Sequence, residues 1–291
     1  MGSIKRAIIA LVLTFAFSSA ALAQSAQPKQ GTHLAPVWKF DPADRVIGDG
    51  GPAPKRDFTG SWAGPRSGAG VPDPERAEIP VLTEAGRKLF EQNKPLDKYS
   101  PAGTNDPTVR SCDPFGFPRS AIDQNRGIAF AIMPGRIVLM SQFQDSWREI
   151  WMDGRELPKN AGSDEKGSPD PRYNGYSVGH WEDDYTLVID TTGVDDRTWL
   201  TGAGYAHTVH ARFQERYKRT SHNDIELSVT VDDPELYQKP FSLGKYKFRW
   251  IPNQVLDERL CIPSDVIEYL KAVGDPAGSD PKANQGRPSS K

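Results

Sequence analysis

Between residues 127 and 250 the chain alternates strand-like segments with short turns, and this pattern constrains the fold more than any other feature. One face of the segment 224–232 is apolar throughout and consists of Ile225, Leu227, Val229 and Val231. Its other face carries polar side chains, and the segment that ends at Trp250 alternates in the same way. A two-residue period with one apolar and one polar face is typical of an antiparallel sheet that covers a core.

About nine strands are expected, most of them joined in sequence by short turns. They lie at 57–62, 128–133, 136–143, 146–152, 175–181, 185–192, 209–219, 224–232 and 241–250. About eight to ten such strands close most readily as an antiparallel, lipocalin-like barrel, because closure leaves no unpaired edge. We therefore predict an all-β barrel, with a two-sheet sandwich as the competing architecture. Short helices are predicted at 84–92, after Thr83, and at 263–273, with Ser264 as N-cap.

The first 23 residues contain the three parts of a bacterial secretory signal peptide in order. Lys5 and Arg6 form a basic start, residues 7–17 are apolar, and residues 21–23 (Ala-Leu-Ala) form a cleavage pattern. The apolar stretch is shorter than the roughly 20 residues of a spanning helix, so no membrane span is expected after cleavage. We predict a periplasmic or secreted protein, with an uncleaved anchor as the alternative.

Composition divides the rest of the chain into one folded domain and two margins. Residues 24–56 and 274–291 are rich in Pro and Gly and have no hydrophobic period, which is typical of disordered or extended segments. A single domain is therefore expected at 57–273. The net charge of −2 becomes −4 without Lys5 and Arg6, and no basic cluster is present, so nucleic acid is not an expected partner.

The chain has two cysteines, Cys112 and Cys261, and both lie in the predicted domain. Exported proteins meet an oxidising compartment, where paired cysteines normally form a disulfide bond. We therefore predict a bridge that ties the start of the folded region to its end. Two free or metal-binding thiols are the alternative, although the sequence has no Cys-x-x-Cys motif.

Two resemblances to known families rest on short motifs. Gly60-Ser61-Trp62 resembles the Gly-x-Trp opening of the calycins, which include the lipocalins. This implies that Trp62 closes the barrel floor and that Arg249 packs on it. Longer strings resemble a family of exported bacterial β-rich proteins without an assigned activity, which implies export and a β architecture over about 57–270. These strings are CDPFGFPR (112–119), WREIWMDGR (147–155), GYSVG (175–179), DTTG (190–193), DDRTWL (195–200) and ERY (215–217).

Two charged side chains are expected inside the barrel. Glu215 lies between Phe213 and Tyr217 in the alternation, and Arg148 shares the phase of Ile150. A carboxylate on an apolar face must be paired or have a raised pKa. A Glu215–Arg148 pair would therefore be either structural or a proton carrier with its charge stabiliser.

The histidines and Asp190 give weaker candidates. His180 shares a strand face with Tyr176, and we expect it to point inward beside the catalytic candidates. Asp190 interrupts an apolar strand end and is either a ligand-facing carboxylate or a turn cap. The second family resemblance implies a histidine after His207, where this chain has Arg212 and an offset His210. His207 and His210 fall on opposite faces of a strand, so no metal site is expected.

Aromatic side chains are the most numerous candidates for contacting a ligand, because small-molecule pockets are mainly apolar and aromatic. Trp147 and Trp151 share a strand face and can form a stacking wall. The segment 195–200 is suited to be a lid over a barrel mouth, or is an ordinary surface loop. The candidate ligand contacts are Trp147, Trp151, Tyr176, Trp199, His207 and Tyr217.

These observations favour an exported barrel that binds a small apolar or aromatic molecule in its cavity. The alternative is a cofactor-independent isomerase, cyclase or lyase that uses Glu215, His180, Asp190 and Arg148 in that cavity. A third possibility is an envelope protein that binds another protein. No cofactor is expected, because the sequence has no P-loop, no dinucleotide fingerprint, no nucleophile elbow and no zinc-protease motif. Convergence of Glu215, His180 and Arg148 in one cavity would favour the enzyme.

Overall fold

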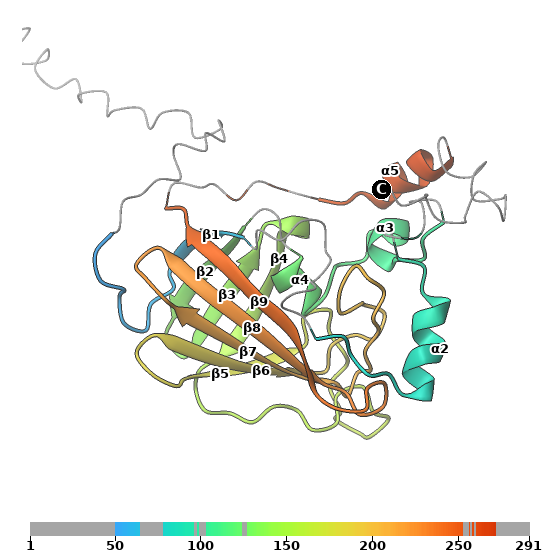
Figure 1. Cartoon of the computed structure of the whole chain (residues 1–291), viewed down its shortest axis with the longest axis horizontal. Helices are drawn as coiled ribbons and strands as arrows, with labels where there is room; N and C mark the ends of the chain where they lie inside the picture. Colours follow the sequence, from blue (N-terminus) through green and yellow to red (C-terminus); the bar gives the residue numbers. More distant parts are fainter. Residues whose placement is uncertain are drawn as a thin grey trace, which may run out of the picture. The chain divides into compact units, whose positions relative to one another are not determined.

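The structure, a computed structural model, describes residues 50–64, 78–95, 98, 103–123, 127–252, 256, 258 and 260–271. Nine strands in these residues close into one barrel, in which each strand pairs with the next and β1 also pairs with β9 (Figure 1). The strands are β1 (Gly60–Ala63), β2 (Ile128–Met133), β3 (Arg136–Ser141), β4 (Ser146–Trp151), β5 (Tyr176–Trp181), β6 (Thr186–Thr192), β7 (Arg212–Arg219), β8 (Asp224–Asp232) and β9 (Phe241–Trp250). The closure confirms the predicted all-β barrel and excludes the two-sheet sandwich.

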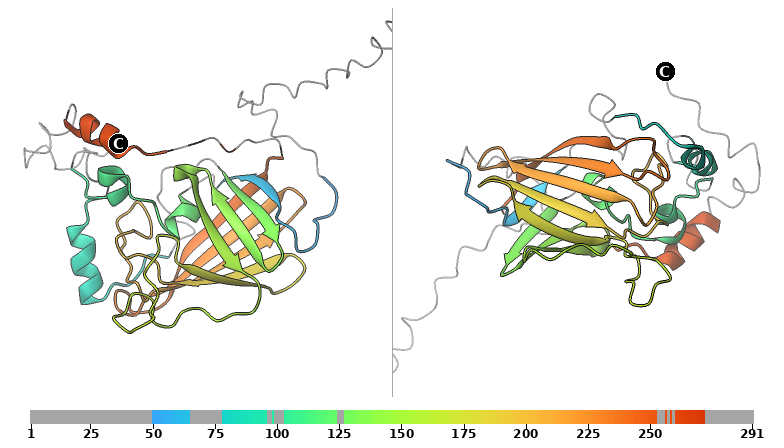
Figure 2. Two further views of the ribbon diagram at one scale, coloured as in Figure 1. Left: turned by 180° about the vertical axis from the view of Figure 1, so that it is seen from behind. Right: turned by 90° about the horizontal axis from the view of Figure 1, so that it is seen from below.

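One strand pair departs from the predicted antiparallel meander. β4 and β5 are parallel, and only Ile150↔Ser177 and Trp151↔Val178 are in register between them. The reason is the connection 152–175, which runs along the outside of the barrel and returns the chain to the end where β4 began (Figure 2). Parallel neighbours need such a long crossover, whereas antiparallel ones are joined by tight turns.

The helices gather at one end of the barrel, here called the helix end (Figures 1 and 2). α2 (Glu84–Gln92) has the predicted bounds, and the Thr83 side chain accepts a hydrogen bond from the Gly86 amide as its N-cap. α5 (Pro263–Tyr269) also starts where predicted, but its N-cap is Ile262 rather than Ser264. Two short helices were not predicted, α3 (Pro107–Ser111) and α4 (Arg119–Ile122), because the segment around them has no hydrophobic period.

The opposite end of the barrel is closed by Trp62, but its arginine partner differs from the prediction. The Trp62 indole N–H donates to the carbonyl of Phe58 at 2.8 Å. The guanidinium carbon of Arg219, at the end of β7, lies 4.9 Å from the Trp62 ring centroid. Arg249 instead faces outward, 3.3 Å from Asp224. Arg219 is the buried one because its N–H donors are satisfied by the carbonyls of His222, in the turn after β7, and of Asp57, before β1.

A disulfide bond joins Cys112, after α3, to Cys261, before α5, and so confirms the predicted bridge. It fixes the terminal helix to the helix end of the barrel. The predicted signal peptide (1–23), the margin up to residue 49 and the tail 274–291 lie outside the described residues. Within the described residues, none of the helices has the length and apolar character needed to cross a membrane.

Candidate functional site

The centre of the barrel contains the predicted pair of Arg148 and Glu215. Both carboxylate oxygens of Glu215 lie 2.8 Å from Nη2 of Arg148, and the Tyr217 hydroxyl donates to Oε1 at 3.1 Å. Glu215 is fully buried and Arg148 is 5% exposed. The prediction that β4 and β7 turn these side chains inward is therefore correct.

Electrostatics keep Arg148 charged and Tyr217 neutral. Burial alone would lower the pKa of Arg148, but the adjacent Glu215 carboxylate outweighs it and the pKa is raised. Burial, reinforced by Glu215, raises the pKa of Tyr217 far above its usual range, so its phenol is a neutral donor. Within the described residues, Nη1 of Arg148 has no hydrogen-bond partner. The Arg148 cation is thus buried without all of its donors satisfied, which is costly in a core.

Phe117 closes the space above this pair. Its ring centroid is 4.3 Å from the Arg148 guanidinium carbon, and it packs in a T-shaped contact with Phe213, with the two ring centroids 5.2 Å apart. The side chains around the pair are almost completely buried. Those with no exposed area include Phe117, Ile150, Leu187, Ile189, Glu215, Tyr217, Leu227 and Val229. The middle of the barrel is therefore packed, and the prediction of a ligand cavity there is not supported. The reason is that the segment before α4 inserts Phe117 into the barrel.

The other two catalytic candidates lie outside the barrel wall. His180 pairs with Val188 on β6 and is exposed, so the expectation that it points inward is wrong. Asp190 also faces outward and accepts a hydrogen bond from Gln214 on the neighbouring strand at 3.0 Å. Glu215, His180 and Arg148 therefore do not converge in one cavity, and the arrangement expected of the enzyme alternative is not found.

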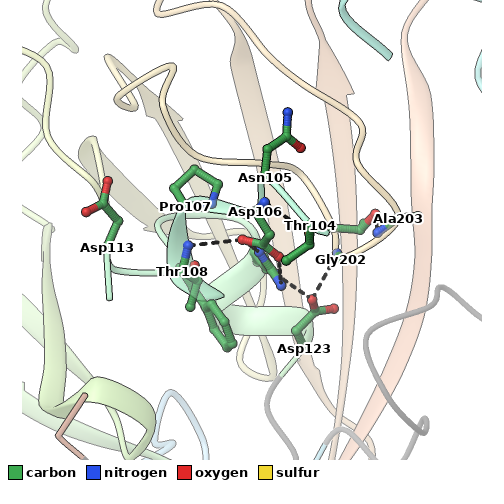
Figure 3. A network of polar contacts seen from close by, with 12 residues as sticks. Thr104, Asn105, Asp106, Pro107, Thr108, Asp113, Asp123, Gly202 and Ala203 are labelled. Atoms are coloured by element: carbon green, nitrogen blue, oxygen red, sulfur yellow. Dashed lines mark hydrogen bonds and ion pairs between the residues drawn. The ribbon is translucent and has the colours of Figure 1, made fainter. Parts of the chain in front are cut away.

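A buried polar network holds the Phe117 segment in place. Arg119 pairs with Asp106 at 2.8 Å and with Asp123 at 3.0 Å. Figure 3 shows the Thr108 amide hydrogen-bonded to Asp106 and the Gly202 amide to Asp123. Burial raises the pKa of Asp123 to about 6, although Arg119 opposes this shift. The network links α3 and α4 to the loop after β6, and its full burial points to a structural role.

Three aromatic candidates meet in a groove on the outer face of β4 and β5, here called the outer groove. Its volume is about 500 Å³. It is lined by Trp147, Glu149 and Trp151 of β4, by Arg155, Glu156, Leu157, Pro158, Arg172, Tyr173, Asn174 and Gly175 of the connection, and by Tyr176, Ser177 and Val178 of β5. Trp147 is 67% exposed, so its indole is available to a ligand. The sequence predicted the shared face of Trp147 and Trp151.

The connection between β4 and β5 forms the far wall of the outer groove. The side-chain amide of Asn174 donates to the Trp147 carbonyl at 3.2 Å, and the Tyr176 hydroxyl donates to the Asp170 carbonyl at 2.7 Å. These bonds tie the connection to both strands. A second cavity of about 350 Å³ shares Arg155, Glu156, Leu157 and Val178 with the outer groove and reaches Asp190 and Arg212. Asp190 thus lines the space next to the aromatic wall.

Arginine side chains cover the aromatic rings around the outer groove. The guanidinium carbon of Arg155 is 3.6 Å from the centroid of Trp151, and that of Arg172 is 4.5 Å from the centroid of Tyr176. Cations over aromatic faces are stabilised by the ring quadrupole. Arg155, Arg172 and Tyr173 were not predicted as groove residues, because loop residues show no period. The available signal for arginines beside the aromatic wall was the repeated occurrence of Trp and Arg within residues 147–155.

The remaining ligand candidates lie elsewhere. Tyr217 belongs to the central pair, and Trp199 is buried at the helix end. His207 is also buried there, with Nε2 2.8 Å from the Thr198 hydroxyl oxygen. Burial lowers the pKa of His207, so its ring is neutral near pH 7. The segment 195–200 packs into this end with all but Asp196 and Arg197 buried, and its role as a lid over the barrel mouth stays a prediction.

The described residues contain no cluster of three or more His, Cys, Asp or Glu side chains that could hold a metal ion. Comparisons with protein-family models, with curated proteins and with solved structures found no match to this chain. The function must therefore be argued from the geometry of the outer groove.

Proposed function

We propose that this protein is an exported barrel that binds a small molecule with a flat apolar or aromatic body in the outer groove. The observation that carries the proposal is the meeting of Trp147, Trp151 and Tyr176 at a concave space large enough for such a molecule. Ligand sites are typically concave, mainly apolar and crossed by a few placed polar groups. The groove combines aromatic and aliphatic side chains with polar ones such as Glu149, Arg155 and Arg172, and the sheet forms one of its walls.

The packing of the barrel centre supports this location. Lipocalin-like barrels bind ligands in the interior when side chains leave room there. Here Phe117 and the Arg148–Glu215 pair occupy the centre, while the Trp147 indole stands exposed on the wall. Export is supported by the signal-like residues 1–23 and by the disulfide bond, which is normal for oxidising compartments.

The test is a titration of the full mature chain with N-phenyl-1-naphthylamine, a neutral aromatic probe whose fluorescence rises in apolar surroundings. We expect W147A/W151A to bind it about tenfold more weakly, since each aromatic contact contributes about 0.5–1.5 kcal/mol beyond its buried area. The control is Y269A, which removes a 53% exposed aromatic side chain from α5. Absence of binding to the wild type, or equal binding by W147A/W151A and Y269A, would refute the proposal.

A further inference from the structure

The arginines around the outer groove differ in whether an acidic side chain neutralises them. Arg136 pairs with Glu149 at 2.7 Å and Arg155 with Asp153 at 2.6 Å. Arg197, whose guanidinium lies over Tyr173, pairs with Asp195 at 2.6 Å. Arg172 forms no ion pair with an acidic residue in the part of the chain that the structure describes, although it is exposed and lines the groove.

The position of Arg172 is fixed by its backbone. Its amide donates to the Gly193 carbonyl at 3.0 Å, and its own carbonyl accepts from the amides of Gly175 and Asp195, both at 2.9 Å. The guanidinium then lies over the ring of Tyr176, whose hydroxyl is itself bound to the connection. Both the cation and the ring beneath it are therefore held in place before any ligand arrives.

Nearby acidic groups do not neutralise this cation. Glu149 in the groove is engaged by Arg136, and Glu156 lies 3.2 Å from Lys159. A guanidinium that rests on an aromatic face keeps its edge N–H donors free, and their planar fork matches the two oxygens of an acid group. The groove thus combines an aromatic wall with one positioned donor that lacks an anion.

We propose that the outer groove selects ligands that carry an acidic group on a flat apolar body, and that Arg172 binds the acidic group. Trp147 and Trp151 contact the flat body, and Arg172 donates two hydrogen bonds to the anion. This inference rests on the proposed function and adds the charge of the ligand to it. The neutral ligand of the same shape binds more weakly, because it leaves Arg172 without an acceptor.

The experiment compares two probes with the same anilinonaphthalene skeleton on the full mature chain. One is 1-anilinonaphthalene-8-sulfonate, and the other is N-phenyl-1-naphthylamine, which lacks the sulfonate. We expect the wild type to bind the sulfonate about tenfold more tightly. R172Q should weaken the sulfonate about tenfold and leave the neutral probe within twofold, because a charge-assisted bidentate contact is lost. R172K keeps the charge but not the planar pair of N–H donors. It should bind the sulfonate about threefold to fivefold more weakly than the wild type.

Two controls separate a local effect from a general one. K88Q removes one positive charge from an exposed position on α2, away from the groove. R249Q/D224N removes a paired guanidinium together with its own acid outside the groove and leaves the net charge unchanged. Both should keep the preference for the sulfonate within twofold of the wild type.

The outcomes separate this inference from the proposed function. Equal affinities of the wild type for both probes, or equal effects of R172Q and K88Q on the sulfonate, would overturn the inference while binding in the groove stands. If W147A/W151A binds both probes as tightly as the wild type, the proposed function itself fails and the inference fails with it.

Discussion

Removal of Arg148 tests whether the centre of the barrel is a structural pair. R148M leaves the fully buried carboxylate of Glu215 with the Tyr217 hydroxyl as its only donor among the described residues. Loss of one partner of a buried ion pair costs about 3–5 kcal/mol, because the other charge stays in the core uncompensated. For a domain of this size the melting temperature Tm should fall by roughly 6–20 °C.

The double variant R148M/E215Q decides the cause of that loss. It removes both charges and keeps an acceptor for Tyr217, so the remaining cost is an incompletely bonded amide of about 1–3 kcal/mol. The double variant should therefore be more stable than R148M, although it carries one more substitution. Denaturant unfolding at pH 7 measures both free energies of unfolding.

A pair on the barrel surface gives the matched control. Arg136 and Glu149 lie on neighbouring strands at 2.7 Å, with side chains 35% and 38% exposed. Exposed pairs contribute about 0–1 kcal/mol, so R136M should lower the free energy of unfolding by no more than about 1 kcal/mol. If R148M costs no more than R136M, or if R148M/E215Q is less stable than R148M, the assignment of a buried charged pair is refuted.

Two further predictions concern the helix end. Because burial raises the pKa of Asp123 from 3.8 to about 6, the folded state binds more protons than the unfolded state between these values. Stability should therefore fall by about 2 kcal/mol as pH rises from 4 to 6. Denaturant titrations across this pH range should show a flatter slope for D123N, and equal slopes in both proteins would contradict this. The disulfide closes a loop between residues 149 positions apart, so C112A/C261A should lose about 4–5 kcal/mol in unfolding experiments, and a loss below about 1 kcal/mol would show that the bridge does not constrain the unfolded chain.

Local periodicity was enough to predict the strands, because each strand has one face on the core. It also placed Arg148 and Glu215 inside, since a residue in phase with buried neighbours points the same way. The same reasoning failed for His180, which lies on the outward face of β5. Alternation along a strand sorts its residues into two faces but does not say which face is buried. The pairing of the whole sheet decides that.

Contacts made by irregular segments were beyond such reasoning. Phe117 fills the barrel from a segment without a period, and its place depends on the network of Arg119, Asp106 and Asp123. Likewise, Arg219 rather than Arg249 lies over Trp62, because the carbonyls that satisfy it come from a turn and from the segment before β1. These choices depend on tertiary hydrogen bonds that no alternation of side chains encodes.

The parallel pairing of β4 and β5 explains why a site forms on the outside of this barrel. An antiparallel hairpin would need only a tight turn, and the outer face of β4 would then be open to solvent. The parallel pair instead requires the connection 152–175, which crosses that face and carries Arg155, Arg172 and Tyr173 to Trp147 and Trp151. The sequence contains a sign of this crossover in the long polar gap between two strand patterns. Such a gap marks the part of the barrel wall where a concave surface can form.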